Sequence, residues 1–597
     1  MSERIRNRSE IPQEDTWAIE DLYVSDEAWE QELATLAEDK KTLASFDGLL
    51  GQNGKNLYDY LYTSEQIDVK CSRLGNYASR RADVDTRDSK YQAMKGKFTG
   101  VVVDIRSATS FDTPQIMAIE DDKLESFYRE YPALERYRRY LTNIRRFRAH
   151  ILSAQEEKLL AAAGEMGSAP GSVYSALNNA DLKFKDALDA EGKAHPVTQG
   201  TFVLCQESSD RTLRKNAYES LYDGYAGVRN ASAGLLDAQN KKLKFYAKAR
   251  KYESAFEAAL DGTEVPTAVY LNLIETVHKH LDKMHRYVSL RKKLLGLDTL
   301  HFYDIYTPLV PSVDKKIPYA DAKQTVYDAL APMGEDYRAV LKEGFDNRWI
   351  DVYQNEGKRS GAYSAGAQVH PYVLLNYTGT LDSQFTLAHE MGHALHSWYS
   401  NKYQNPLDSD YVIFVAEVAS TCNEALLMEH LLAKTSDKKE RAYLINHFLE
   451  QFKGTLYRQT MFAEFELNIG KMVGEGQTLT ADTLCAEYRR LCELYYGPDM
   501  VVDDRIAIEW ARIPHFYYDY YVFQYATGYC AAIALSRRIL TEGEQAVQDY
   551  IRFLSGGCSK DPIALLRDAG VDMAGPEPVE QALMLFAELL DEMEALL

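Results

Sequence analysis

A short segment of the sequence has residue types and a spacing that could bind a metal ion. His389, Glu390 and His393 form an HExxH motif within the run Thr386–His396. Residues four apart lie on one face of a helix, so both imidazoles can direct a ring nitrogen at one ion, and neutral imidazole is a good ligand for Zn²⁺. Glu390 lies beside the first histidine, where its carboxylate could accept a proton from a water molecule activated by the metal.

A chance match to this motif is improbable in a chain of this length. The chain has 13 histidines in 597 residues, and with glutamate at about 7–8% only about 0.02 random matches are expected. The flanking positions predict a buried helix because they are apolar. They are Leu387, Ala388, Met391, Ala394 and Leu395. Metal binding is therefore favoured over coincidence.

A catalytic zinc ion usually takes three protein ligands and keeps one position open, so a further ligand is needed. His396 lies about 10.5 Å from His389 along a helix axis. His396 therefore cannot bind the same ion. We expect it to lie in the core or to contact one of the metal ligands without binding the metal. The longer metzincin motif requires Gly at position 396 and His at 399, where this chain has His396 and Tyr399. That class is excluded.

The third ligand is expected to be a carboxylate on another helix. The segment Val412–His430 has a helical, mostly apolar pattern and contains Glu417. A buried carboxylate needs a partner charge, which a metal ion could provide, and a structural salt bridge is the alternative. Glu424 lies seven residues further along the same face. It could hydrogen-bond a ligand histidine or be an ordinary acid of the helix.

Helical periodicity dominates the segments that must position these residues. One long helix is expected over 267–295, with Pro266 at its start. Two segments lack the pattern: Leu182–Gln206 predicts a β-hairpin, and Gly361–Thr380 predicts one or two short strands just before the HExxH motif. Further helices are expected over about 27–47, 57–110, 122–165, 208–250, 319–344 and 578–597.

Composition and charge restrict the partners and the compartment. A net charge of −21 repels phosphate backbones and anionic lipids, so we expect neither nucleic acid nor a membrane surface as a partner. The seven cysteines form no CxxC pair, and the charged segment Met1–Asp15 has no apolar core of a secretion signal. The most apolar stretch, around Tyr525–Leu535, is well short of the roughly 20 residues that span a bilayer. These features predict a cytoplasmic protein.

Four segments in order resemble oligoendopeptidase F, a family of thimet-oligopeptidase-like zinc metallopeptidases. The HExxH motif alone is compatible with several families of zinc peptidases, whereas the four segments in order favour this one. The resemblance extends over nearly the whole chain. The four segments are Trp17–Trp29, then Arg359–Tyr363 with Pro371–Asn376, then the HExxH motif with Phe414–Glu424, and finally Pro514–Gly528.

The resemblance implies a mainly α, two-lobed, zincin-like metallopeptidase with a deep channel, one zinc ion on its floor and a small β-sheet near the zinc helix. The break in the helical pattern at Leu182–Gln206 places a boundary near residue 200, with a helical N-terminal lobe over about 1–200 and a catalytic domain over 201–597. The implied activity is zinc-dependent hydrolysis of internal bonds in oligopeptides. The implied site residues are His389, His393 and Glu417 as metal ligands, Glu390 as general base, and Glu424 as the partner of a ligand histidine.

The family takes the groups that stabilise its oxyanion from a C-terminal His/Tyr motif. His515, Tyr518, Tyr521 and Tyr525 are spaced three, three and four residues apart, which is one face if the segment is helical. We expect His515 and Tyr521 to donate hydrogen bonds to the oxyanion. Position 523, often tyrosine in the family, is Phe523 here, and simple packing of these rings is the alternative.

Two other functions are open from the sequence. A zinc carboxypeptidase of similar helical fold also carries HExxH, and it would need a fixed cationic group to bind the free C-terminal carboxylate. A non-catalytic peptide-binding protein of this fold would usually have lost a ligand or the base. The three expected ligands His389, His393 and Glu417 and the expected base Glu390 are all present here, which disfavours the non-catalytic alternative.

Overall fold

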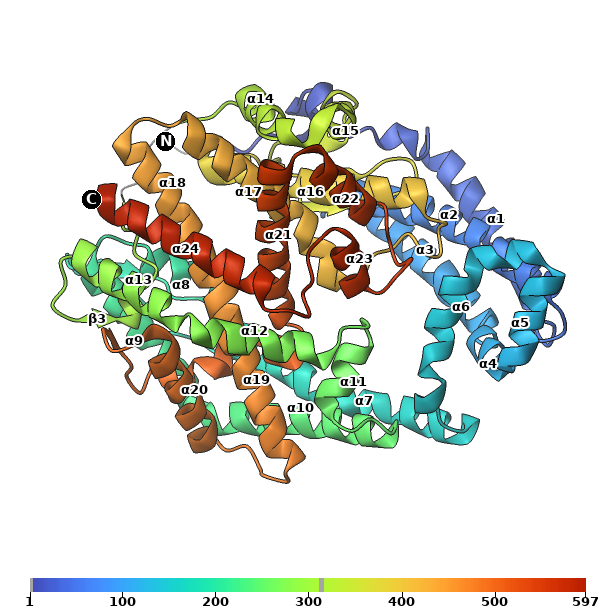
Figure 1. The fold of residues 1–597 in the computed structure, drawn as a ribbon, viewed down its shortest axis with the longest axis horizontal. Coiled ribbons are helices and arrows are strands. Elements are labelled where there is room, and N and C mark those ends of the chain that lie inside the picture. The colour runs from blue at the N-terminus through green and yellow to red at the C-terminus, as the bar shows by residue number, and fades with distance from the viewer. Residues whose placement is uncertain (1–3, 311–315, 597) are drawn as a thin grey trace. The chain divides into compact units, whose positions relative to one another are not determined.

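The computed structural model describes residues 4–310 and 316–596, and it consists mainly of α-helices with a few very short strands (Figure 1). The mainly α class expected from the sequence is confirmed. The chain forms two compact units, each assembled from three segments. The first unit takes its residues from Met1–Ala149, Lys315–His430 and Leu535–Val571, and the second from His150–Asp314, Leu431–Ala534 and Asp572–Leu597. The expected boundary near residue 200 concerns sequence segments rather than these units, and it stays a prediction.

In the first unit, α1, α2 and α3 pack side by side around a shared apolar core (Figure 1). Helix α1 starts where the Ser25 hydroxyl accepts the Ala28 N–H, and its Trp29 is fully buried. The helices of this unit are α1 (Asp26–Ala44), α2 (Gly54–Val84), α3 (Ser89–Ala108), α4 (Asp112–Ala118), α5 (Asp121–Glu130), α6 (Arg138–Arg145), α14 (Tyr319–Ala329), α15 (Gly334–Asp346), α16 (Leu381–Tyr403), α17 (Ile413–Lys434, which extends four residues past the unit), α22 (Glu544–Leu554) and α23 (Pro562–Asp568).

A three-stranded sheet precedes α16 in the first unit and packs against it. Its strand order is β4 (Ile350–Asp351), β6 (Tyr372–Leu374), β5 (Tyr363–Ala365), with β6 parallel to β4 and antiparallel to β5. The central strand β6 is fully buried, as expected for a continuous apolar run. The prediction of one or two short strands within 361–380 is thus confirmed, with β5 and β6 in that segment, whereas β4 was not predicted.

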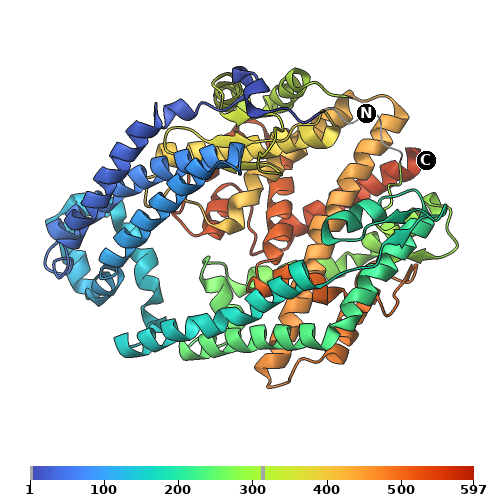
Figure 2. The same ribbon diagram turned by 180° about the vertical axis from the view of Figure 1, so that it is seen from behind.

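In the second unit, α7 and α10 lie side by side (Figure 2). The helices of this unit are α7 (Ala154–Ala176), α8 (Gln199–Gln206), α9 (Arg211–Gly227), α10 (Arg229–Ala249), α11 (Ala255–Asp261), α12 (Thr267–Lys279), α13 (Leu281–Leu294), α18 (Lys438–Gln451), α19 (Arg458–Gly474), α20 (Ala481–Tyr496), α21 (Phe523–Glu542, which extends into the first unit) and α24 (Glu577–Leu596). A short parallel pair joins β3 (Leu300–His301) to β7 (Met500–Val501).

The β-hairpin expected within 182–206 is confirmed. Strand β1 (Ala187–Leu188) pairs antiparallel with β2 (Ala194–His195). The Asp189 carboxylate closes the turn by accepting the Lys193 N–H at 2.8 Å. The second extended run is shorter than expected, because the Thr198 hydroxyl caps the start of α8.

The single helix expected over 267–295 is wrong. The chain forms α12 and α13, which are separated at His280, where φ is −121° and ψ is 19°. The His280 carbonyl accepts a hydrogen bond from the Tyr457 hydroxyl at 3.2 Å, so the break leaves this group satisfied. Apolar periodicity does not reveal such a break because both helices bury the apolar face that the pattern reports.

None of the helices in the described part of the chain combines the length and the apolar character that crossing a bilayer requires.

Candidate metal centre

Helix α16 carries the HExxH motif on its polar stripe. The helix begins where the Thr380 hydroxyl accepts the Ser383 N–H at 3.1 Å. The apolar residues around the motif are buried, as the sequence predicts. The rings of His389 and His393 lie one turn apart, with centroids separated by 4.8 Å. Burial of the apolar faces therefore fixes the direction in which this pair of imidazoles points.

A glycine within the motif allows α17 to approach α16 closely. A Cβ atom at Gly392 would lie 2.5 Å from Ser420 Cα and 2.6 Å from the Ala419 carbonyl oxygen. The two backbones are therefore in contact at this point, and no side chain other than hydrogen fits between them. Asn423 fixes the register of the two helices by donating to the Ala388 carbonyl at 3.1 Å.

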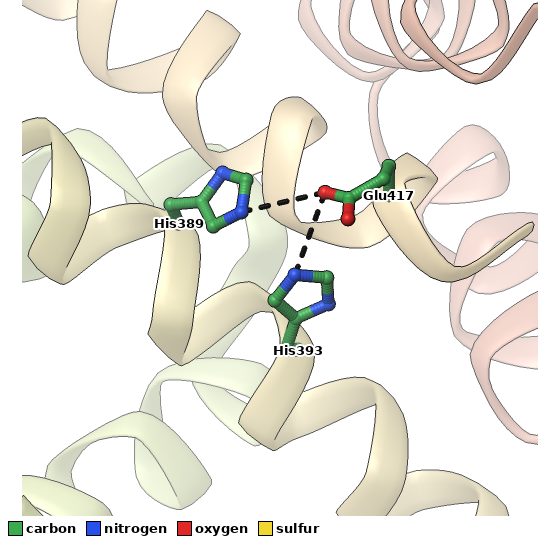
Figure 3. Close-up of side chains that lie close together, drawn as sticks. All are labelled: His389, His393 and Glu417. Carbon is green, nitrogen blue, oxygen red and sulfur yellow. Dashed lines mark ion pairs between the residues drawn. The ribbon is translucent and has the colours of Figure 1, made fainter. Parts of the chain in front are cut away.

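This close approach brings Glu417 of α17 to both imidazoles (Figure 3). Its Oε2 atom lies 3.4 Å from His389 Nε2 and 3.5 Å from His393 Nε2. Two ligand atoms bound at about 2.0–2.1 Å to a tetrahedral zinc ion lie about 3.3–3.4 Å apart. The three side chains can thus hold one metal ion, and two histidines with one glutamate are a donor set that suits zinc.

Glu424 orients the imidazole of His389, and Ser420 orients the carboxylate of Glu417. Glu424 Oε1 lies 2.7 Å from His389 Nδ1, which assigns the ring proton to Nδ1 and leaves the Nε2 lone pair directed at the site. The Ser420 hydroxyl donates to Glu417 Oε2 at 3.1 Å. Of the two interpretations of Glu424, the geometry favours a partner of the ligand histidine.

The electrostatics of the site call for a cation. Burial lowers the pKa of His389, but hydrogen bonds and charge from Glu417 and Glu424 outweigh burial and raise this pKa to about 10. Burial likewise opposes ionisation of Glu417, yet hydrogen bonds from the two imidazoles hold the pKa of its carboxyl well below the usual range. A bound metal ion would therefore replace a proton on His389 Nε2 as the partner of Glu417, while the Nδ1 proton keeps its bond to Glu424.

Glu390 differs from the other acids of the site. It is 6% exposed, and its Oε2 atom has no hydrogen-bond partner among the described residues. Burial raises the pKa of its carboxyl group. A buried acceptor without a protein partner beside a metal site is what a group that binds and deprotonates water requires.

His396 lies in the core, as expected, and does not join the other two histidines. It is 1% exposed and stacks on Tyr411 with ring centroids 3.7 Å apart. Burial lowers the pKa of its imidazole to about 3, so it is neutral at physiological pH.

The predicted oxyanion donors belong to the second unit, whereas the three metal-site residues belong to the first. The sequence placed the four rings on one face only if the segment is helical, and the segment is not one continuous helix. A short 3₁₀ helix over Pro514–Tyr517 is followed by left-handed residues Asp519 and Tyr520, and α21 begins only at Phe523.

The four rings nevertheless cluster because this turn folds the chain back. The His515 ring centroid lies 5.6 Å from those of Tyr518 and Tyr525 and 6.4 Å from that of Tyr521. The Tyr525 hydroxyl lies 3.5 Å from His515 Nε2. Burial lowers the pKa of His515, which keeps the imidazole neutral with one N–H to donate. The roles of His515 and Tyr521 stay predictions.

Several supporting residues were missed in the sequence. Gly392, Ser420 and Asn423 set the distance and register between α16 and α17, yet none is a metal ligand. A glycine inside an apolar helix was the available signal, since such a residue usually has a packing reason. Its partner on α17 could not be identified, because the contact joins residues that are distant in sequence.

Comparison with known proteins identifies the family of this chain. A family model described as Peptidase family M3 matches residues 204–585, and one described as Oligopeptidase F matches residues 115–184. Oligopeptidase PepF of Bacillus subtilis (strain 168) is 47% identical over 595 residues, which cover 100% of this chain and 89% of the relative.

Two solved structures are similar over nearly the full length. Oligoendopeptidase-F from Enterococcus faecium has a TM-score of 0.74 and 36% identity, covering 96% of this chain and 99% of its own. A protein from Chlamydophila abortus has a TM-score of 0.94 and 36% identity, covering 100% of both chains.

The contact at Gly392 can be tested with a single methyl group. Gly392→Ala should separate α16 from α17, costing about 1–3 kcal/mol of stability through overpacking, and should weaken zinc binding because Glu417 moves away from the histidines. Thermal unfolding and zinc titration against a chelator measure both effects. Gly100→Ala in α3 is the matched control, since nothing lies within 4 Å of its added Cβ. Unchanged zinc affinity in Gly392→Ala would contradict this account.

The two acids of α17 are expected to differ in their effect on zinc. Glu417→Ala removes a donor atom, so zinc content should be lost. Glu424→Ala leaves all three donors in place and should weaken zinc binding by only about 10–100-fold. Metal analysis after dialysis against graded chelator concentrations shows which variant loses zinc more readily. If Glu424→Ala loses the metal and Glu417→Ala keeps it, the two roles are reversed.

Proposed function

This chain belongs to peptidase family M3, and we propose that it is a zinc-dependent oligoendopeptidase that hydrolyses internal bonds of short peptides. The observation that carries the proposal is the meeting of His389, His393 and Glu417 beside Glu390, whose Oε2 has no hydrogen-bond partner among the described residues. When bound, a zinc ion supplies Lewis acidity that polarises the scissile carbonyl and lowers the pKa of the attacking water. Co²⁺ or Mn²⁺ could occupy the same donors, so metal analysis of the purified protein identifies the ion.

The protein's own residues hold the metal and move the proton. His389 and His393 would bind the metal ion through Nε2 and Glu417 through Oε2, while Glu424 orients the His389 ring. Glu390 takes a proton from the attacking water and delivers it to the leaving amine. The carbon–nitrogen bond breaks as the new carbon–oxygen bond is retained, so the products are a carboxylic acid and an amine.

We assign the oxyanion contacts to His515 and Tyr521. The assignment is supported by the family resemblance of this segment and by the clustering of polar rings around His515. A neutral imidazole N–H and a phenol O–H are suitable donors to a carbonyl oxygen that becomes negatively charged.

The edge strand β5 is a candidate site for the peptide backbone. In the sheet order β4-β6-β5, β5 pairs only with β6 among the described strands. An extended peptide could add to β5 by main-chain hydrogen bonds, a mode that is largely independent of sequence. Such binding suits an enzyme that accepts many short peptides.

The substrate class separates this proposal from its alternatives. A peptide blocked at both ends should be cut internally, with products identified by mass spectrometry, and cutting should stop when zinc is chelated. A carboxypeptidase would leave the blocked peptide intact and release single residues from an unblocked one. A non-catalytic peptide-binding protein would cut neither.

A cytoplasmic location, expected from the cysteine usage, stays a prediction.

Substitution of the base should separate chemistry from metal binding. Glu390→Gln keeps the size of the side chain but removes the ability to accept a proton, so turnover should be almost abolished while zinc content stays at the wild-type level. Turnover of the blocked peptide and metal analysis of the same preparation test this. Activity close to wild type would disprove the role of Glu390.

Removal of single hydroxyl groups should identify the oxyanion donor. Tyr521→Phe should lower kcat/KM by roughly 10²–10³-fold, the effect of losing one such donor, with most of the loss in kcat and none in zinc content. Tyr518→Phe and Tyr525→Phe serve as controls from the same cluster. A loss confined to Tyr525→Phe would move the role to that residue. Three variants within a few-fold of wild type would show that these tyrosines only pack.

A further inference from the structure

The turn between His515 and Tyr521 is anchored by a buried carboxyl group. Asp519 and Tyr520 are consecutive left-handed residues, with φ of 56° and 61°. Residues other than glycine rarely adopt this conformation, and two in succession persist only where their surroundings hold them. The Tyr520 N–H donates to Oε1 of Glu466 at 2.7 Å. This bond fixes the orientation of the peptide group between the two strained residues.

Glu466 is poorly explained by packing alone. It comes from α19, is 3% exposed, and its Oε2 atom has no hydrogen-bond partner among the described residues. Burial raises the pKa of its carboxyl group to about 8, although the Tyr520 N–H favours the ionised form. Burying such a group is unfavourable, and an apolar side chain would fill the same space without that penalty. The acceptor oxygen is therefore the property that the site uses.

The Tyr520 side chain packs against α11, α12 and α19. It is 2% exposed, and its ring lies against Phe256 at 5.3 Å and Tyr270 at 6.2 Å. A Cβ atom at Gly470 would lie 2.0 Å from the Tyr520 hydroxyl, so only glycine leaves room for this ring. Glu466 and Gly470 are one turn apart on α19 and thus face the turn together.

The other strained residue is held from α10. The Gln239 side-chain amide donates to Asp519 Oδ1 at 2.8 Å, and Gln239 itself is 1% exposed. The turn is therefore fixed on both sides by buried side chains. Beyond it, the rings of Tyr521 and Tyr525 lie against each other with centroids 5.3 Å apart, and both lie near His515.

We propose that Glu466 is a positioning residue that, by accepting the Tyr520 N–H, keeps the turn left-handed and thereby holds the Tyr521 ring beside the ring of His515. If Tyr520 relaxed to negative φ, the chain would leave the turn in another direction and the Tyr521 ring would separate from His515. The proposal rests on the proposed function in one respect, namely that His515 and Tyr521 stabilise the oxyanion.

The first test removes the acceptor oxygen. Glu466→Leu should lower kcat on the blocked peptide by up to about 100-fold, the loss expected when a catalytic group moves by about 1 Å, with KM and zinc content little changed. Glu466→Gln keeps an acceptor oxygen and should stay within a few-fold of wild type. If Glu466→Leu does not fold, Glu466→Met also lacks the acceptor and adapts more easily to the site. Equal kcat values for the Gln and Leu variants would overturn the proposal.

A double-mutant cycle separates positioning from loss of structure. Glu466→Leu should have little further effect once Tyr521→Phe has removed the hydroxyl that it positions, so the two losses should not be additive. Glu464→Leu is the matched control, because Glu464 is a buried acid of the same helix that instead accepts the Tyr495 hydroxyl at 2.9 Å. The effect of Glu464→Leu on kcat, corrected for the folded fraction, should be the same in the wild type and in Tyr521→Phe.

Two outcomes separate the positioning role from the proposed function. Tyr521→Phe slows turnover if the proposed function is right. If Glu466→Leu then slows turnover by the same factor in the Tyr521→Phe variant as in the wild type, the positioning role is wrong although the proposed function stands. If neither Tyr521→Phe nor His515→Gln alters turnover, the oxyanion assignment fails, and this proposal fails with it.

Discussion

The contact between α16 and α17 at Gly392 is the constraint on which the metal site depends. A carboxylate on one helix can reach two imidazoles on another only if the helix axes are close, and side chains normally keep axes 8–10 Å apart. Glycine at position 392 brings the Ser420 backbone against α16. Glu417 therefore meets His389 and His393 with distances that suit a single tetrahedral ion.

The balance of charge around His389 determines what this geometry can bind. Glu417 and Glu424 both lie against His389, and the resulting excess of negative charge is compensated either by a proton on the imidazole or by a metal ion. Glu390 stands apart from this network, because its Oε2 has no protein partner in the described structure. One acid is thus used for binding and another is kept for proton transfer, and their surroundings rather than their type set the difference.

The His515 segment reaches its arrangement by a different physical route. Regular secondary structure places the metal ligands, whereas two left-handed residues fold the chain so that tyrosines from α21 and the preceding turn surround an imidazole. Such a conformation is unfavourable locally and has to be stabilised by the buried residues around it. Glu466, Gln239 and Gly470 come from two helices far away in sequence and provide that stabilisation.

The sequence by itself determined whatever depends on local spacing. A repeat of 3.6 residues places His389 and His393 on one face of a helix, and an acid in the apolar run of α17 pointed to Glu417 before any contact was known. The same reasoning did not reveal the break at His280 or the turn in the His515 segment, since periodicity reports which face is buried and not whether the backbone continues. Tertiary structure alone decided that Gly392 faces Ser420 and that Glu466 accepts the Tyr520 N–H. These contacts join residues 28 and 54 positions apart, and their energies depend on distances that only the packed fold sets.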